Sequence, residues 1–181
     1  MKKLNIVLPA HNEHNNISPI YNEIISALSG CNYAYEILFV DDGSTDDTLS
    51  KIKNLAIADP KVKFIELSRN FGHQNALKAG MDATNADIMI MMDCDLQHPP
   101  RLINELLRNY ELGYDIVRTN RVDHNATGFF KAKTSTLFYK ILNNQKDLAP
   151  FNLKCVNCNT QNILQAGTVL YSINFSSNNN F

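Results

Sequence analysis

The feature that most constrains the fold is a regular alternation of short apolar runs with segments of helical periodicity. Each apolar run is typical of a strand, and in each following segment apolar residues recur every three or four positions. Strands separated by helices of this length form a mostly parallel sheet with helices on both faces, so the sequence predicts an α/β fold. The expected strands cover residues 4–8, 37–40, 62–67, 88–92 and 116–119, and the expected helices 17–28, 44–59, 75–83, 99–110 and 130–141.

Local signals indicate where several of these helices begin and end. Ser18-Pro19 offers a cap followed by a proline at the first helical position. Residues 44–47 have the pattern of a capping box, which predicts that the second helix begins at Ser44. Asp59-Pro60 ends that helix, because the residue before a proline is pushed out of the helical region.

Composition and charge narrow the class of protein. Apolar residues make up 44% of the 181 residues, enough for one domain with a real core, and the net charge of −1 gives little support to a nucleic-acid partner. No uninterrupted apolar stretch reaches the roughly 18 residues of a membrane span. The N-terminus also lacks the long apolar region of a signal peptide, so we expect a cytoplasmic location.

Polar side chains follow three of the predicted strands, at residues 9–13, 41–44 and 93–98. In a parallel sheet these segments meet at one edge, where ligands bind. Several carboxylates would then crowd into one cleft and repel one another. A bound divalent cation removes that repulsion.

Asp93 and Asp95 have the spacing of an Asp-x-Asp metal site directly after a buried strand. Mg²⁺ and Mn²⁺ favour oxygen ligands and accept substrate phosphates into their shell, and Gln97 offers a further oxygen nearby. The metal would act as a Lewis acid on a leaving diphosphate. The alternative is that both aspartates cap the loop before the helix at Pro99; their place among other acidic strand ends favours the metal site.

The acidic residues of the first two strand ends have alternative interpretations as well. A carboxylate of Asp41 or Asp42 could accept a hydrogen bond from the N–H of a nucleotide base, whereas Gly43 and Ser44 suit a turn and a helix cap. Glu13 is either part of the site or an ordinary first-turn acid favoured by the helix dipole.

Four motifs in order resemble those of the family-2 glycosyltransferases. They are Val7-Leu8-Pro9-Ala10-His11-Asn12-Glu13, Val40-Asp41-Asp42-Gly43-Ser44-Thr45-Asp46, Leu67-Ser68-Arg69-Asn70-Phe71-Gly72-His73 and Met92-Asp93-Cys94-Asp95-Leu96-Gln97-His98-Pro99-Pro100. Within that family the chain looks most like the polyprenyl-phosphate (dolichyl-phosphate type) sugar transferases, and the resemblance covers residues 4–144.

The resemblance implies a GT-A fold and inverting transfer from a UDP- or GDP-sugar to an acceptor such as polyprenyl phosphate, in cell-surface glycan or glycolipid synthesis. It implies Mg²⁺ or Mn²⁺ held by Asp93, Asp95 and Gln97, with Asp93 and Asp95 catalytic. The implied nucleotide-sugar contacts are Pro9, Ala10, Glu13, Asp41, Asp42, Ser44, Arg69, Gly72, Lys78, Asp93, Cys94 and Asp95.

Basic residues near the predicted fifth strand suit an acceptor phosphate. In this family, basic residues at the positions of Arg118 and Arg121 suit an acceptor phosphate, and the guanidinium fork of arginine binds phosphate oxygens in pairs. The alternative is a solvated basic loop. The predicted helix at 130–141 carries Lys131, Lys133 and Lys140. It either lies on the inner face of the cell membrane, which would make the protein peripheral, or packs on the core.

The end of the chain departs from the family. Residues 155–181 contain no charged residue and many asparagines, and they show no clear periodicity. The pair Cys155-x-x-Cys158 lacks the further ligands of a zinc site, so we interpret it as structural or accidental. We therefore expect a catalytic domain at 1–144, incomplete at its C-terminal end, and an atypical, disordered or frame-shifted tail at 145–181.

Two other functions compete with an active transferase. The first is a truncated, non-catalytic remnant that binds a nucleotide-sugar without turnover. The second is a nucleotidyltransferase with a similar sheet, which would carry a glycine- and arginine-rich phosphate loop after the first strand. Residues 9–13 do not have that composition, so the transferase remains the preferred hypothesis.

Overall fold

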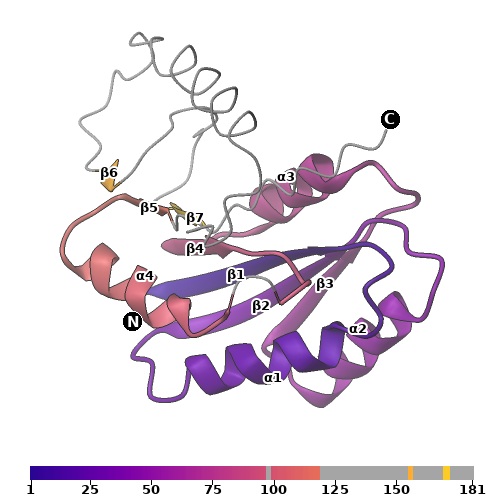
Figure 1. The fold of residues 1–181 in the computed structure, drawn as a ribbon, viewed down its shortest axis with the longest axis horizontal. Helices are drawn as coiled ribbons and strands as arrows, with labels where there is room; N and C mark the ends of the chain where they lie inside the picture. Colours follow the sequence, from indigo (N-terminus) through magenta and orange to yellow (C-terminus); the bar gives the residue numbers. More distant parts are fainter. Residues whose placement is uncertain (97–98, 119–154, 157–168, 172–181) are drawn as a thin grey trace, which may run out of the picture.

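The computed structural model describes residues 1–96, 99–118, 155–156 and 169–171 and has a parallel sheet at its centre (Figure 1). The strands pair in the order β3-β2-β1-β4-β7-β5-β6, and every pair is parallel. This confirms the predicted α/β class. The strands are β1 (Lys3–Ala10), β2 (Ala34–Asp41), β3 (Val62–Glu66), β4 (Ile88–Met91), β5 (Ile116–Arg118), β6 (Cys155–Val156) and β7 (Val169–Tyr171).

Helices cover both faces of the sheet, as the sequence predicts. Figure 1 shows α1 and α2 below the sheet and α3 above it, and the buried residues of α4 belong to the same core cluster as those of α1. Within the described part of the chain, no helix is long and apolar enough to cross a membrane. The helices are α1 (Ile17–Ala27), α2 (Thr48–Ala58), α3 (His73–Ala83) and α4 (Leu102–Glu111).

The capping signals predicted for two helices are wrong, although the expected first helix does begin at residue 17. Helix α1 begins at Ile17, so Ser18 and Pro19 lie in its first turn, where the N–H that proline lacks has no helical partner to lose. Helix α2 begins at Thr48, four residues after Ser44. The reason is that Ser44 and Thr45 form hydrogen bonds with the loop after β1, while Asp46 accepts the N–H of Thr48, where the helix begins.

The core lies in two layers because side chains alternate across each strand. Leu4, Ile6 and Leu8 of β1 pack on the side of α1, α2 and α4, whereas Val7 packs on the side of α3. All four are at most 1% exposed. The continuous apolar runs of β1, β2 and β4 therefore reflect burial on both faces, as in other parallel sheets.

Several predictions concern residues outside the described part of the chain. These are Gln97, Arg121, Cys158, the helix at 130–141 and most of the tail at 145–181. The tail contributes two described strands, β6 and β7, and β7 pairs with both β4 and β5. The domain boundary at residue 144 stays a prediction.

Gly80 allows α3 to pack closely on the sheet. A Cβ atom at this buried position would lie 2.4 Å from Cγ1 of Val7 and 3.0 Å from Cγ2 of Val40. Both valines are β-branched and fully buried on central strands, so neither can move away easily. The absence of a side chain at Gly80 thus sets the distance between α3 and the strands that carry the polar segments.

We predict that Gly80→Ala lowers the free energy of unfolding by about 1–3 kcal/mol, the usual range for overpacking a core. The loss should appear although alanine favours a helix over glycine by about 1 kcal/mol. Urea unfolding of Gly80→Ala, Val7→Ala and the double variant would measure it. Because Val7→Ala removes the atom that is overpacked, the double variant should lose less than the sum of the single losses; additive losses would contradict the close contact.

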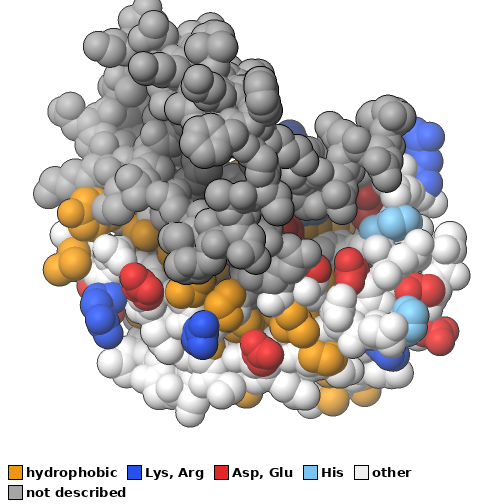
Figure 2. Space-filling model, viewed as in Figure 1, with side chains coloured by type: hydrophobic (Ala, Val, Ile, Leu, Met, Phe, Trp, Pro, Cys, Tyr) orange, Lys and Arg blue, Asp and Glu red, His pale blue; other side chains and the backbone are white. Residues whose placement is uncertain are grey.

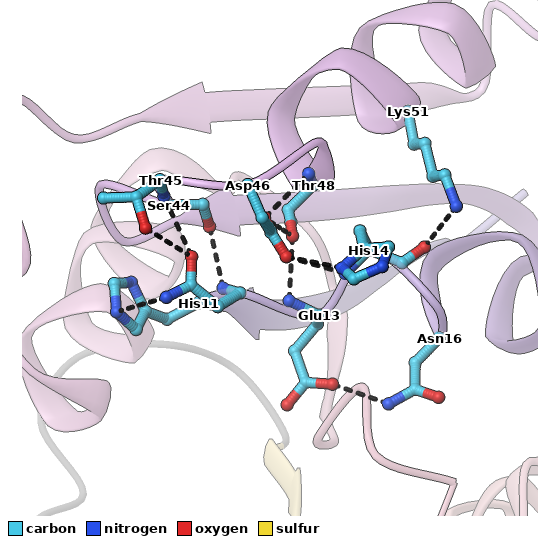
Figure 3. A network of polar contacts seen from close by, with 10 residues as sticks. His11, Glu13, His14, Asn16, Ser44, Thr45, Asp46, Thr48 and Lys51 are labelled. Atoms are coloured by element: carbon cyan, nitrogen blue, oxygen red, sulfur yellow. Dashed lines mark hydrogen bonds and ion pairs between the residues drawn. The ribbon is translucent and has the colours of Figure 1, made fainter.

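The loops that follow β1 and β2 are joined by a network of polar contacts (Figure 3). The Asp46 carboxylate accepts hydrogen bonds from the backbone N–H of Thr48 (2.9 Å) and from Nδ1 of His14 (2.7 Å). Thr48 Oγ1 accepts the N–H of Glu13 at 2.8 Å, and Lys51 Nζ donates to the His14 carbonyl at 2.7 Å. The two loops are therefore held together as one unit at the edge of the sheet.

The charge of Asp46 is stabilised by this network. Partial burial alone raises the pKa of its carboxyl, but the hydrogen bonds from Thr48 and His14 outweigh that effect and hold the pKa well below its usual range. Because the pKa is lower in the folded protein, ionised Asp46 stabilises the fold above the pKa it has in the unfolded chain. That stabilisation is lost as the pH falls toward the folded pKa.

We predict that Asp46→Asn lowers the free energy of unfolding by about 1–3 kcal/mol at pH 7, because it removes a charged hydrogen-bond acceptor. Relative to wild type, the loss should shrink as the pH falls below about 4, the ordinary pKa of an aspartate. Urea unfolding between pH 7 and pH 3 would measure both effects.

Asp47→Asn is the matched control, since Asp47 is exposed and its side chain does not cap α2. It should change the stability by less than about 0.5 kcal/mol. A loss for Asp46→Asn that stays constant across the pH range would contradict the role of its charge.

Candidate functional site

The strand ends that carry the polar segments lie side by side. β1 pairs with β2 up to Ala10 and Asp41, and β1 pairs with β4 up to Val7 and Met91. The segments after these three strands therefore meet at the carboxyl edge of the sheet, as predicted. Figure 2 shows acidic and histidine side chains gathered on the side of the molecule where these strands end.

Asp41 lies at this edge with one oxygen unpaired. Its side chain is 1% exposed, and Oδ2 accepts the N–H of Ser44 at 3.2 Å. Oδ1 is buried and has no hydrogen-bond partner in the described structure. A buried acceptor without a partner costs about 1–3 kcal/mol, so such a group suits a ligand that brings an N–H.

The neighbouring Asp42 has a different environment. It is 3% exposed, and its two carboxylate oxygens accept the backbone N–H groups of Phe71 (2.8 Å) and Gly72 (2.9 Å). Its own backbone N–H donates to Ala10, and its carbonyl accepts from Nδ1 of His11, both at 2.8 Å. Asp42 thus joins the ends of β1 and β2 to the loop after β3.

Gly43 brings the same loop close to the end of β2. Its φ angle is +62°, which side-chain-bearing residues rarely adopt. A Cβ atom here would lie 2.3 Å from the backbone carbon of Arg69 and 2.6 Å from the nitrogen of Asn70. The Arg69 guanidinium in turn lies 4.7 Å from the centre of the Phe71 ring. The loop that contains residues 69–72 is therefore packed directly against residues 42 and 43.

The Asp-x-Asp segment follows β4 on the other side of β1. Oδ1 of Asp93 accepts a hydrogen bond from Nε2 of His73 at 2.8 Å, and this bond raises the pKa of His73 above its usual value. Cys94 is buried, and its thiol donates to the Pro9 carbonyl at 3.4 Å. Burial raises the pKa of this thiol well above its usual value, so the thiol stays protonated at neutral pH.

The donor atoms present suit an oxygen-preferring divalent cation. Within residues 1–96 and 99–118, no group of three or more His, Cys, Asp or Glu side chains forms a ready-made metal site. Asp93 and Asp95, separated by one residue, supply two carboxylates. Mg²⁺ characteristically takes one or two carboxylates together with substrate phosphates and water. The residues present therefore fit a cation that arrives with a diphosphate.

The other predicted site residues differ in where they lie. Oε2 of Glu13 accepts the side-chain amide of Asn16 at 2.6 Å, at the start of α1. Oγ of Ser44 accepts the N–H of Asn12 at 3.0 Å. Both stand at the carboxyl edge of the sheet. Lys78, in contrast, pairs with Asp82 one turn along α3 at 2.8 Å, and both side chains are exposed, so it lies in a surface ion pair.

Two contacts at this edge were not assigned from the sequence. His73 was noted only as part of the third motif, and its contact with Asp93 depends on a pairing across 20 positions. Asp46 lies in the predicted capping box, and besides the N–H at the start of α2 it binds His14, which lies in a different loop. The sequence offers one signal for these contacts: His14 directly follows the first motif, and His73 is the last residue of the third motif.

Several curated proteins are similar in sequence. The chain is 38% identical over 143 residues to the uncharacterized glycosyltransferase YkcC of Bacillus subtilis (strain 168), covering 79% of this chain and 44% of YkcC. It is 39% identical over 141 residues to the bactoprenol glucosyl transferase of Shigella phage SfX, covering 78% of this chain and 46% of that protein. The chain thus spans less than half the length of these relatives.

Solved structures share the fold. Glucosyl-3-phosphoglycerate synthase from Mycobacterium tuberculosis, in complex with Mn²⁺, UDP-glucose and phosphoglyceric acid, has a TM-score of 0.57 and 23% identity. That match covers 78% of this chain and 50% of the synthase. Mannosyltransferase PcManGT from Pyrobaculum calidifontis, in complex with GDP-Man and Mn²⁺, has a TM-score of 0.53 and 22% identity, covering 66% of this chain and 36% of that one.

These likenesses confirm the GT-A fold that the motifs implied. The match to the family described as glycosyl transferase family 2 runs from residue 5 to residue 165, which is most of the chain. It includes all four motifs and the strand ends that carry them. The chain belongs to glycosyl transferase family 2.

Proposed function

We propose that this protein transfers a sugar from a UDP- or GDP-sugar to polyprenyl phosphate with inversion, using Mg²⁺ or Mn²⁺. The observation that carries the proposal is the meeting of Asp41, Asp93 and Asp95 at one edge of the sheet in a family-2 chain. Relatives named bactoprenol glucosyl transferases support the acceptor. Structural neighbours solved with UDP or GDP-Man and Mn²⁺ support the donor and the metal.

The donor nucleotide would bind across the ends of β1 and β2. The unpaired Oδ1 of Asp41 would accept an N–H of the base, which relieves the cost of its burial. The remaining nucleotide-sugar contacts in this proposal are those named from the motifs: Pro9, Ala10, Glu13, Ser44, Arg69, Gly72 and the backbone of Cys94.

The donor diphosphate would lie beside the end of β4. Asp93, Asp95 and Gln97 would hold the cation, which supplies positive charge to the leaving diphosphate when it is bound. The imidazole of His73, kept beside Asp93 at 2.8 Å, adds a hydrogen-bond donor to the same place. The chain's own part is to fix these groups before the donor arrives.

The acceptor chemistry requires no general base from the protein. The second pKa of a phosphate monoester is about 6, so the phosphate of a polyprenyl phosphate is already largely ionised at neutral pH. Positioning would then supply much of the rate. Arg118 and Arg121 would hold the phosphate, and the protein would act at the inner face of the cell membrane, where such a lipid presents its head group.

We predict that Asp95→Asn weakens Mn²⁺-dependent binding of UDP or GDP by at least about tenfold, because it removes one carboxylate from the cation. Isothermal titration of UDP, GDP and their sugars, with and without Mn²⁺, would measure the loss. Asp87→Asn is the matched control, since Asp87 precedes the same strand at its opposite end and accepts the N–H of Lys3 at 2.7 Å. Equal binding by wild type and Asp95→Asn would overturn the metal assignment.

Turnover separates the transferase from a protein that only binds. An active transferase releases nucleoside diphosphate when Mn²⁺, a nucleotide-sugar and polyprenyl phosphate are all present. Tight Mn²⁺-dependent binding without release would instead support the nucleotide-sugar-binding role and exclude activity of this chain.

A further inference from the structure

We propose that Asp42 is a positioning residue that holds His73 against Asp93 by fixing the backbone at Phe71 and Gly72. In this role Asp42 acts on the cation site through the protein and touches neither donor nor metal. The consequence for metal binding rests on the function proposed above, whereas the coupling between Asp42 and His73 does not.

The first step is the contact between Asp42 and the loop. Its two carboxylate oxygens each accept one backbone N–H, from Phe71 at 2.8 Å and from Gly72 at 2.9 Å. Hydrogen bonds to an ionised acceptor are roughly twice as strong as neutral ones. Each oxygen of Asp42 thus has a backbone partner within the protein. Its carboxylate is therefore committed to the loop.

The second step is that the loop has few alternative positions. Gly43 packs so closely on Arg69 and Asn70 that no Cβ atom would fit between them. The N–H of Leu67 also donates to the Asp41 carbonyl at 2.9 Å, which holds the start of the loop on β2. The loop is thus fixed at its start by Asp41, in its middle by Gly43 and at its end by Asp42.

The third step leads from the loop to His73. Gly72 is the residue before α3, and its carbonyl accepts the N–H groups of Asn75 and Ala76 at 2.9 and 3.1 Å. Fixing Gly72 therefore fixes the first turn of α3. His73 is the first residue of that turn, and its Nε2 donates to Asp93 Oδ1 at 2.8 Å. The N–H of Gly72 is shared between Asp42 (2.9 Å) and Oδ1 of Asn70 (2.8 Å), and the hydrogen bond to Asp42 is the one that ties the residue before His73 to the end of β2.

Gly72 provides an independent way to disturb the same contact. Its φ and ψ angles are 93° and 151°, a region that is essentially restricted to glycine. No atom lies within 4 Å of a Cβ built at this position, so Gly72→Ala would strain the backbone without a steric clash. This variant keeps the negative charge of Asp42, which Asp42→Asn removes. A change in the His73 ring signal that both variants share, measured without metal or nucleotide, must come from the position of the loop.

The experiment measures two quantities on the full chain at one fixed pH. The first is the NMR signal of the His73 ring in the metal-free protein, assigned with His73→Ala. The second is Mn²⁺ affinity in the presence of UDP, measured from the EPR signal of free Mn²⁺. The variants are Asp42→Asn and Gly72→Ala. The control is Asp59→Asn, whose carboxylate also accepts a backbone N–H, from Lys61 at 2.9 Å, but lies away from this loop.

We expect both variants to shift the His73 ring signal and to weaken Mn²⁺ binding by about 10- to 100-fold, the range found when groups that orient metal ligands are removed. Asp59→Asn should leave both quantities unchanged. In a His73→Ala background, Asp42→Asn should cause no further loss of Mn²⁺ affinity, since it acts through that side chain.

Several results would overturn the proposal. An unchanged His73 signal in either folded variant would show that the loop does not hold the ring. A shifted signal with unchanged Mn²⁺ affinity, or an undiminished effect of Asp42→Asn in the His73→Ala background, would remove the link to the cation. If Asp42→Asn does not fold, Gly72→Ala decides by the same two readouts. If wild type binds Mn²⁺ with neither UDP nor GDP, the function proposed above fails, while the ring signal still tests the coupling.

Discussion

The parallel pairing of β1 with β2 on one side and β4 on the other is the constraint on which the rest of the molecule depends. It places three polar segments, from distant parts of the chain, at one edge of the sheet. The sheet is buried on both faces, so these strands cannot slide without moving apolar side chains to new positions. The fixed register then allows short side chains such as aspartates to meet neighbouring loops at hydrogen-bond distance.

Two adjacent aspartates illustrate how much a single position changes at such an edge. Asp41 is the last residue of β2 and keeps one buried oxygen without a partner, which suits a ligand. Asp42 is the next residue, and both of its oxygens bind the backbone of the protein itself. The second motif contains the two aspartates in succession and does not distinguish their roles. The geometry separates them into an acceptor available to a ligand and an acceptor that organises a loop.

The sequence predicted the fold well because apolar periodicity and burial have a direct physical relation. The strand at 37–40 and the helix at 17–28 could be recognised from local pattern alone. The start of α2 could not, because Ser44, Thr45 and Asp46 form hydrogen bonds with residues about 30 positions earlier. The contact between His73 and Asp93 was likewise beyond local pattern, since it depends on how α3 packs against β1 and β2. Which of the site residues bind a donor remains a prediction.

The unpaired oxygen of Asp41 has a consequence for selectivity. A buried acceptor that has no partner costs about 1–3 kcal/mol. A ligand that presents an N–H at this point recovers that loss, and a ligand of the same shape without the N–H does not. Sites of this kind discriminate by the penalty on the wrong molecule more than by extra attraction for the right one. In the function proposed above, this oxygen would therefore distinguish the donor base from close analogues that lack the N–H.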